Sequence, residues 1–324
     1  CTGYYNDPHE RMFVFMVSKH GNHTLFMNDL FYLEHDLDVN IVWHKDGQDA
    51  IQTIVDEMHF PGRIGIDKNW ASHFLLDLMK KLPDAKYINA SPCVDLVRMK
   101  KDLQEQVLMI ESSKINDAVM EEIIPFIQEG VTEKQLAKKL DELFFNHHST
   151  CYGAIVAFGK NAADPHHEND DTLLRKGDCV LIDMGCVYKG YCSDMTRTFF
   201  YEGILEEEIK VYEIVKKANE AAEAMIKPGV KLSDIDKCAR KVISDEGYGK
   251  YFTHRLGHFI GRDVHEYGDV SSVNEMEVEE GMIFSIEPGI YLEGNFGVRV
   301  EDLVMVTKDG CQVLNSFTKD IYII

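Results

Sequence analysis

This chain of 324 residues lacks the marks of several common classes of protein. No apolar run is long enough to span a bilayer, so we expect no membrane partner. Basic side chains are few, 34 against 55 acidic ones, and the net charge of −21 argues against nucleic acid as a partner because phosphates would be repelled. The eight cysteines are scattered without a CxxC pair, which predicts a reduced, cytoplasmic protein with no disulfide framework.

Residues 1–95 have neither a phosphate-cradling GxGxxG loop nor a nucleophile elbow. They show instead short apolar runs that alternate with amphipathic stretches, which predicts a small α/β cap or partner domain. Because the chain opens on Cys1 rather than methionine, we expect this domain to be incomplete at its start. The expected strands are the hairpin Met12–Val17 and Thr24–Met27, the buried runs Ile41–Trp43 and Arg63–Asp67, and Tyr87–Ala90, and the expected helices are Ala50–Met58 and Trp70–Lys81.

A charged, strongly helical stretch follows Ser91-Pro92, and we place a second domain over residues 96–324. Thr132, with Gln135 three residues on, predicts a capping box at the start of a helix. Ser233 has the side chain of a helix N-cap. The other expected elements are helices over Met99–Ile124, Ile204–Met225 and from Ser233 to about Glu246, and a strand over Gly153–Phe158.

An internal repeat organises the second domain. Residues 176–185 (KGDCVLIDMG) align with residues 280–289 (EGMIFSIEPG), so that each copy has a carboxylate six residues after its first glycine and another glycine two residues later. Each copy then reaches a second carboxylate on its next strand. The repeat therefore predicts two related halves that each give one hairpin and two acids to a shared centre. The paired acids are Asp183 with Glu287 and Asp194 with Glu301.

These four carboxylates lie in apolar runs, where an unpaired acid costs several kcal/mol. Salt bridges to Arg197 and Arg299 are the alternative, but two arginines cannot easily neutralise four acids and Asp302. Divalent cations solve the problem better. With His258 as the one nitrogen ligand and no cysteine, the donors suit Mn²⁺, Co²⁺ or Fe²⁺ better than structural zinc. Two ions bridged by carboxylates would hold a shared water and lower its pKa.

The motifs of the second domain also carry a family resemblance. The sequence resembles the metallopeptidases of the pita-bread fold, and specifically their Xaa-Pro branch, which holds prolidase (Xaa-Pro dipeptidase) and Xaa-Pro aminopeptidase. Residues 1–95 resemble the creatinase-like cap domain of that branch more weakly. The matching motifs keep their order and spacing, and they are Pro165-His166, Ile182-Asp183-Met184-Gly185, Asp194-Met195-Thr196-Arg197, His254-Arg255-Leu256-Gly257-His258, Val264-His265-Glu266, Ser285-Ile286-Glu287-Pro288-Gly289 and Gly297-Val298-Arg299-Val300-Glu301-Asp302.

The resemblance implies an α/β creatinase-like cap domain followed by an α+β pita-bread catalytic domain with pseudo-twofold duplicated halves. It implies two divalent ions, Mn²⁺ before Co²⁺ or Fe²⁺ and with Zn²⁺ less favoured. Of the ligands, Asp194 and Glu301 would bridge, and Glu287 would also accept a proton from the nucleophilic water. The implied metal ligands are Asp183, Asp194, His258, Glu287 and Glu301.

The same resemblance assigns roles to residues around the ligands. His166 and His265 resemble the histidines that steady the scissile peptide and its oxyanion. His254 resembles the histidine that contacts substrate in the proline pocket. Tyr291 and Arg299 match positions that border and support the substrate site, with Arg299 orienting a bridging carboxylate.

We therefore expect a dimetal exopeptidase that cleaves the bond before proline and forms a homodimer. The short cap and the HRLGH motif favour a dipeptidase, with an Xaa-Pro aminopeptidase acting on longer peptides as the alternative. The cap and His254 argue against methionine aminopeptidase, and the intact acids argue against a creatinase-like enzyme and against a non-catalytic binding protein on this fold. Two positions stay open. Phe259 stands where many relatives have glycine, and its ring would either narrow the pocket or pack on the proline ring, and His167 lies beside His166.

Overall fold

The computed structural model describes residues 2–4, 6–33, 35–58 and 62–324, and Cys1 lies outside them. The chain divides into two compact units, residues 1–94 and 95–324, and each is described by itself. Among the described residues no helix has the length and apolar character needed to cross a membrane.

Unit 1 is a small α/β domain. Its predicted hairpin is confirmed, because β1 and β2 pair antiparallel, while β2 pairs parallel with β3 and β4 with β5. The expectation that Ile41–Trp43 is buried is wrong, because β3 lies at the edge of its sheet and Trp43 is 44% exposed. The elements are β1 (Val14–Met16), β2 (Thr24–Asn28), β3 (Asn40–His44), α1 (Ala50–Glu57), β4 (Arg63–Ile66), α2 (Ser72–Lys81) and β5 (Lys86–Asn89).

Unit 2 is built from two halves of similar plan. In the first half, β8 (Cys179–Met184) pairs antiparallel with β11 (Met195–Phe200). In the second half, β14 (Ile283–Ile286) pairs antiparallel with β17 (Asp302–Val306). A third strand extends each sheet, but it lies beside β8 in the first half and beside β17 in the second.

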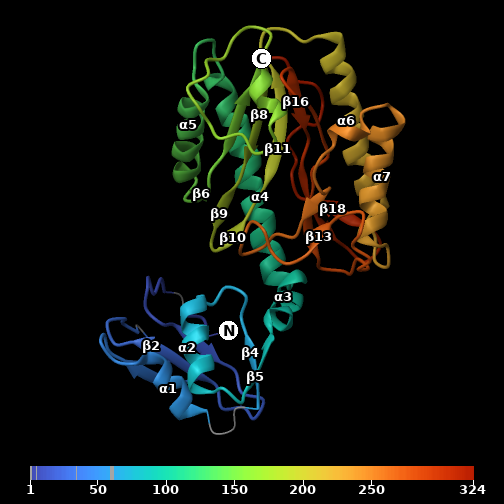
Figure 1. Ribbon diagram of the computed structural model, residues 1–324. Coiled ribbons are helices and arrows are strands. Elements are labelled where there is room, and N and C mark those ends of the chain that lie inside the picture. Colours follow the sequence, from blue (N-terminus) through green and yellow to red (C-terminus); the bar gives the residue numbers. More distant parts are fainter. Residues whose placement is uncertain (1, 5, 34, 59–61) are drawn as a thin grey trace. The chain divides into compact units, whose positions relative to one another are not determined.

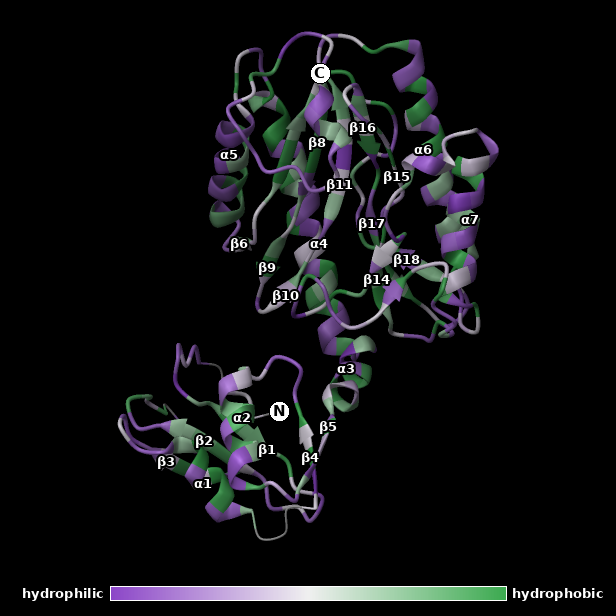
Figure 2. Cartoon of the chain, viewed as in Figure 1, coloured by the Kyte–Doolittle hydropathy of each residue, from purple (hydrophilic) through white to green (hydrophobic). Residues whose placement is uncertain are grey.

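Two helices cover each half. Apolar side chains of α4 and α5 pack with β8 and β11 in one core, and those of α6 and α7 pack with β14 and β17 in another. Figure 1 shows α5 on one flank of the central strands and α6 and α7 on the opposite flank. In Figure 2, α5 and α7 carry both hydrophilic and hydrophobic residues, as expected for helices with one face on a core. The helices are α3 (Ser91–Met99), α4 (Leu103–Ile123), α5 (Glu133–Asn146), α6 (Glu206–Met225) and α7 (Leu232–Asp245).

The helix starts test two local predictions. Thr132 is the N-cap of α5 and forms the predicted capping box with Gln135, so that prediction is confirmed. The prediction that Ser233 caps α7 is wrong, because the helix already begins at Leu232. The Ser233 hydroxyl donates instead to Glu275, 3.0 Å away. A residue distant in sequence therefore engages the side chain that was predicted to cap the helix.

The glycines of the repeat have matching backbones in the two halves. Gly177 and Gly281 have φ of +87° and +85°, and Gly190 and Gly294 have φ of +83° and +75°. Residues with a side chain rarely adopt these conformations, so both copies need glycine at the same turns. The remaining strands are β6 (Thr150–Cys151), β7 (Ile155–Phe158), β9 (Cys186–Tyr188), β10 (Tyr191–Cys192), β12 (Gly257–His258), β13 (Asp269–Val270), β15 (Gly289–Leu292), β16 (Phe296–Arg299) and β18 (Cys311–Val313).

Candidate metal centre

The four acids of the repeat come from the ends of the paired strands. Asp183 lies on β8, opposite Thr196 of β11, and Asp194 directly precedes β11. Glu287 directly follows β14, and Glu301 directly precedes β17. The two halves meet there, because the backbone N–H of Glu301 donates to the carbonyl of Thr196 at 3.1 Å.

His258, on β12, joins these acids. Ligand atoms of Asp194, His258 and Glu301, all buried, lie within 4.8 Å of one another and could hold a metal ion. His258 Nε2 lies 3.5 Å from Asp194 Oδ2 and 3.6 Å from Glu287 Oε1, which is longer than a strong charge-assisted hydrogen bond. The structure thus places the nitrogen ligand of the sequence prediction among acids from both halves.

The electrostatics of the acids call for added positive charge. Loss of hydration, with the charges of Asp194 and Glu287 adding to it and Arg299 opposing it, raises the pKa of Asp183 to about 7. Burial raises the pKa of Glu301 well above its ordinary value, and the same neighbouring acids add to that shift. A cluster whose carboxyl groups resist ionisation fits divalent cations, which would favour the charged forms.

The histidine pKa values respond in opposite directions. Burial alone would lower the pKa of His258, but Asp194 and Glu287 outweigh it, and the net shift is upward. Partial burial lowers the pKa of His265, and the neighbouring His258 and Arg255 lower it further. The ring centroids of His258 and His265 are 4.2 Å apart at an interplanar angle of 67°. His265 thus stands beside His258 as a neutral, exposed imidazole at neutral pH.

The other two predicted histidines lie near each other. His254 Nε2 is 2.8 Å from the hydroxyl of Tyr291, and burial lowers the pKa of His254. The charge of Glu287 opposes that shift, and Arg299 and the exposed His166 add to it. The carbonyl of Pro165, the residue before His166, also accepts from Arg299 Nη1 at 3.5 Å.

Tyr291 and Arg299 are held by protein groups. Arg299 is 2% exposed and donates to Asp183 at 2.5 Å and to the hydroxyl of Tyr291 at 3.0 Å. Arg299 reaches Glu301 only indirectly, because its Nε donates to Thr196, whose hydroxyl donates to Glu301 at 2.6 Å. The carboxylate that Arg299 orients directly is therefore Asp183. A direct contact of either residue with substrate stays a prediction.

The structure answers both open positions of the sequence. The ring of Phe259 is fully buried and packs on Phe284 with ring centroids 5.4 Å apart, so it belongs to the hydrophobic core. A Cβ on Gly268 would meet that ring at 2.7 Å, so glycine makes room for it. His167 turns away from the acids and bonds to Glu133 of α5 at 2.6 Å.

Several supporting side chains gave no signal in the sequence. The Ser285 hydroxyl accepts from the backbone N–H of His258 at 2.9 Å and donates to Glu287 at 3.1 Å, so it connects two of the predicted ligands. Tyr152 donates to the carbonyl of Ser193, the residue before Asp194, at 2.7 Å. The position of Ser285, two residues before Glu287, does not reveal its role, because the other copy of the repeat has Leu181 at the matching position.

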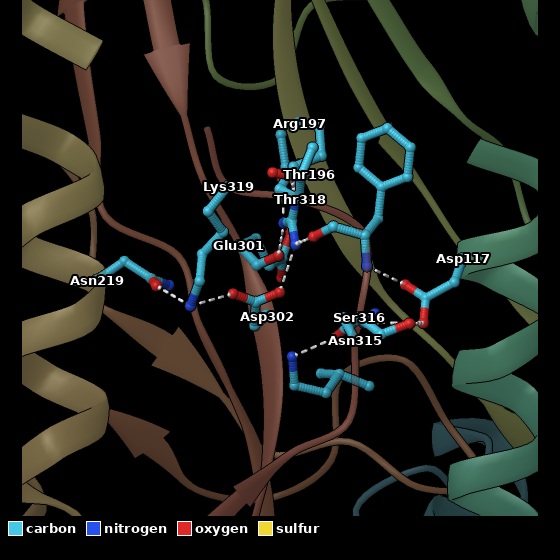
Figure 3. Close-up of polar contacts among 12 residues, drawn as sticks. Asp117, Thr196, Arg197, Asn219, Glu301, Asp302, Asn315, Ser316, Thr318 and Lys319 are labelled. Atoms are coloured by element: carbon cyan, nitrogen blue, oxygen red, sulfur yellow. Dashed lines mark hydrogen bonds and ion pairs between the residues drawn. The ribbon is translucent and has the colours of Figure 1, made fainter. Parts of the chain in front are cut away.

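A buried polar network lies directly behind Glu301. Arg197 donates to the backbone carbonyls of Glu301 at 2.6 Å and Phe317 at 2.8 Å, and to the carboxylate of Asp302 at 2.7 Å. Figure 3 shows Lys319 between Asn219 and Asp302, and its ammonium lies 2.9 Å from each. Of the two arginines considered as the alternative to metal, Arg197 therefore pairs with Asp302.

A second group with ligand-type atoms lies outside this centre. Glu133, His167 and Asp170 also fall within the spacing of metal ligands. The Glu133 carboxylate, however, already accepts from the backbone N–H groups of Phe158 at 2.9 Å and Asp170 at 3.0 Å, and from the side chains of Asn161 and His167. This group therefore acts as a hydrogen-bonded anchor for the segment that carries His166.

Comparison with known proteins gives the same picture along the chain. Residues 107–308 match metallopeptidase family M24, and residues 1–100 match the creatinase/prolidase N-terminal domain. An uncharacterized peptidase of Staphylococcus aureus (strain bovine RF122 / ET3-1) is 35% identical over 98% of this chain and 92% of its own length.

Two solved structures are similar in both sequence and fold. A prolidase from Thermococcus sibiricus is 33% identical with a TM-score of 0.93, covering 100% of this chain and 90% of its own. A dipeptidase from Pyrococcus horikoshii OT3 is 35% identical with a TM-score of 0.91, covering 97% of this chain and 89% of its own. The expected fold, a creatinase-type N-terminal domain followed by a pita-bread domain, is confirmed.

Proposed function

Because this chain belongs to metallopeptidase family M24, a family of metal-dependent hydrolases, we propose that it cleaves the peptide bond before proline as an Xaa-Pro dipeptidase. The observation that carries the proposal is the convergence of acids from both halves on His258, with His265 alongside. Similarity to a prolidase over the whole chain supports the choice of proline. Proline is stiff and lacks an amide hydrogen, so this bond needs a dedicated site.

We propose that two divalent cations, Mn²⁺ in preference to Co²⁺, Fe²⁺ or Zn²⁺, bind at this centre. The mostly oxygen donor set supports that choice of metal. When bound, such cations supply the Lewis acidity that makes water nucleophilic at neutral pH. Asp194 and Glu301 would be shared between the ions, and the complete ligand set would be Asp183, Asp194, His258, Glu287 and Glu301.

The remaining steps fall to side chains of this chain. Glu287, whose side chain is 16% exposed and is fixed by Ser285, accepts the proton of the attacking water. The exposed His265, which lies beside His258, and the exposed His166 steady the carbonyl oxygen as negative charge develops on it. The lowered pKa of His265 keeps its imidazole neutral at neutral pH, so it stabilises by donating an N–H. His254, held by Tyr291, borders the proline and its carboxylate.

Metal removal and reconstitution test this proposal. We expect chelation to abolish cleavage of an Xaa-Pro dipeptide and Mn²⁺ to restore it, with an Ala-Ala dipeptide as the control for proline selectivity. No metal-dependent cleavage of any Xaa-Pro peptide would refute the enzyme proposal and favour a binding protein. His258→Ala should lower the bound metal measured by mass spectrometry, and an unchanged content would refute the ligand role of His258.

An Xaa-Pro tripeptide separates the two branches of the family. Cleavage of the dipeptide in preference to Ala-Pro-Ala supports a dipeptidase, and cleavage of the tripeptide alone would make the protein an aminopeptidase for longer peptides. The proposal includes a cytoplasmic homodimer. Sedimentation at several protein concentrations would measure the oligomeric state.

A further inference from the structure

The loop over residues 261–268 carries His265. The residue after His265, Glu266, forms hydrogen bonds through its backbone N–H and through both oxygens of its carboxylate. The backbone N–H of Glu266 donates to the carbonyl of Phe259 at 2.9 Å. One carboxylate oxygen accepts from Arg98 at 2.6 Å and from the backbone N–H of Arg262 at 2.9 Å. The other oxygen accepts from Lys101 at 3.0 Å. Glu266 therefore ties the loop of His265 to a segment far away in the sequence.

The ion pair between Lys101 and Glu266 is buried on both sides. The side chains are 2% and 4% exposed. Burial lowers the pKa of Lys101, and the charge of Glu266 opposes that shift. Removing two charges from water offsets most of their attraction, so such a pair contributes little net stability compared with apolar side chains of the same size. The role of such a pair is therefore better explained by the position in which it holds the two segments than by the stability that it adds.

The packing around the pair leaves little freedom. A Cβ on Gly261 would meet the Glu266 carboxylate at 2.7 Å and the Lys101 side chain at 2.8 Å, so the loop closes tightly over both. The backbone N–H of Lys101 donates to the carbonyl of Gly281 at 2.8 Å, which fixes Lys101 against the residues that lead into β14. The backbone of Lys101 is thus held by Gly281, and its side chain is enclosed by the loop.

The neighbouring Lys100 provides a contrast within the same stretch of chain. Lys100 pairs with Glu279, but those side chains are 47% and 56% exposed. Exposed pairs typically contribute little and fix little, because water screens them. Two adjacent lysines therefore make one surface pair and one buried pair, and the buried pair reaches the residue next to His265.

We propose that Lys101 is a positioning residue for His265, acting through Glu266 to hold the loop so that the imidazole stays against His258. Its consequence for catalysis rests on the role of His265 in the proposed function. Loss of the ion pair would leave Glu266 with Arg98 as its one remaining cationic partner among the described residues, leave its other carboxylate oxygen buried without a cation, and release the loop. Displacement of a catalytic group by about 1 Å is enough to lower a rate roughly a hundredfold.

The test compares Lys101→Met with Lys100→Met in the metal-loaded, full chain. Hydrogen exchange followed by mass spectrometry on peptides spanning 259–268 needs no substrate. We expect Lys101→Met to speed exchange there about tenfold or more and Lys100→Met to leave it unchanged. Unchanged exchange in Lys101→Met would overturn the proposal, whatever the activity of the protein.

Kinetics of the same variants test the link to His265. We expect Lys101→Met to lower kcat about tenfold to a hundredfold with the metal content unchanged, and to lower it no further in a His265→Ala background. An equal loss of kcat in both backgrounds would show that Lys101 acts elsewhere and would overturn the proposal. If His265→Ala kept full kcat, the catalytic role of His265 would fall and with it the kinetic consequence, while exchange would still decide whether Lys101 holds the loop.

Discussion

The two halves of unit 2 place their acids alike but stabilise them differently. Asp183 and Glu287 are the partly exposed members, with side chains 22% and 16% exposed, and Asp194 and Glu301 are the buried ones. Yet Asp183 takes its cation, Arg299, from the opposite half, whereas Glu287 takes a hydroxyl from its own strand and faces His258. Duplication has preserved the positions of the carboxylates, while their polar partners have diverged.

The two buried arginines show the same divergence. Arg299 points into the centre and bonds to Asp183, whereas Arg197 points behind it and bonds to Asp302 and backbone carbonyls. Arg299 stands two residues before Glu301, and the first copy has Cys192 two residues before Asp194. Each half therefore depends on the other, and neither contains a complete charge balance.

Replacing the two buried acids, Asp194 and Glu301, is the strongest test of whether the two halves contribute equally to the centre. We expect Asp194→Asn and Glu301→Gln each to lower kcat/KM about a thousandfold, roughly 4 kcal/mol of lost transition-state stabilisation, and to lower bound metal equally. Activity assays with metal analysis check this, and the exposed Asp309→Asn serves as control. If one variant kept its metal and the other lost it, the halves would not be equivalent.

Replacing the two arginines should separate activity from stability. We expect Arg197→Met to lower the free energy of unfolding by about 3 kcal/mol, because it leaves the buried Asp302 without its guanidinium partner. Arg299→Met should instead lower metal affinity or activity about tenfold to a hundredfold through Asp183. Urea denaturation and metal titration measure the two effects, and the reverse pattern would contradict the assignment.

The raised pKa of Asp183 predicts pH-dependent metal binding. A carboxyl group with a pKa of about 7 is mostly protonated at pH 6 and mostly ionised at pH 8, so binding of Mn²⁺ should release about one more proton at pH 6. Affinity should accordingly fall as the pH drops below 7. Calorimetry in buffers of different ionisation enthalpy measures the protons, and Asp183→Asn should lower the difference between the two pH values. The part that remains is the contribution of His258, whose pKa is also raised, and an unchanged difference in Asp183→Asn would contradict the assignment to Asp183.

The turn glycines should give the smallest effects and nearly equal ones. Gly190→Ala and Gly294→Ala should each cost about 1 kcal/mol of unfolding free energy, because alanine is strained at φ of +83° and +75°. Gly203, which has open space around it and no positive φ, is the matched control and should tolerate alanine. Thermal denaturation compares the three, and a large difference between the first two would break the correspondence of the halves.

The parts of this site that could be predicted from the sequence are those with a local cause. The repeat revealed its acids because a carboxylate in an apolar strand is costly, and Thr132 revealed a helix start because its partner is three residues away. The other features depend on side chains that are distant in sequence. The residues that flank Ser233 in the sequence do not predict its hydrogen bond to Glu275. Those that flank Phe259 do not predict that Gly268 leaves room for its ring. The tie between Lys101 and Glu266 belongs to the same class.

The network around Arg197 also has a consequence for the order of synthesis. Phe317 and Thr318, whose carbonyls hold its guanidinium, and Lys319, whose ammonium lies beside Asp302, are translated after all the proposed ligand residues. A nascent chain that has already exposed Glu301 therefore still lacks the groups that hold Arg197 in place. On the ribosome, the emergence of the ligands and the completion of their support are two separate events, and the second comes later.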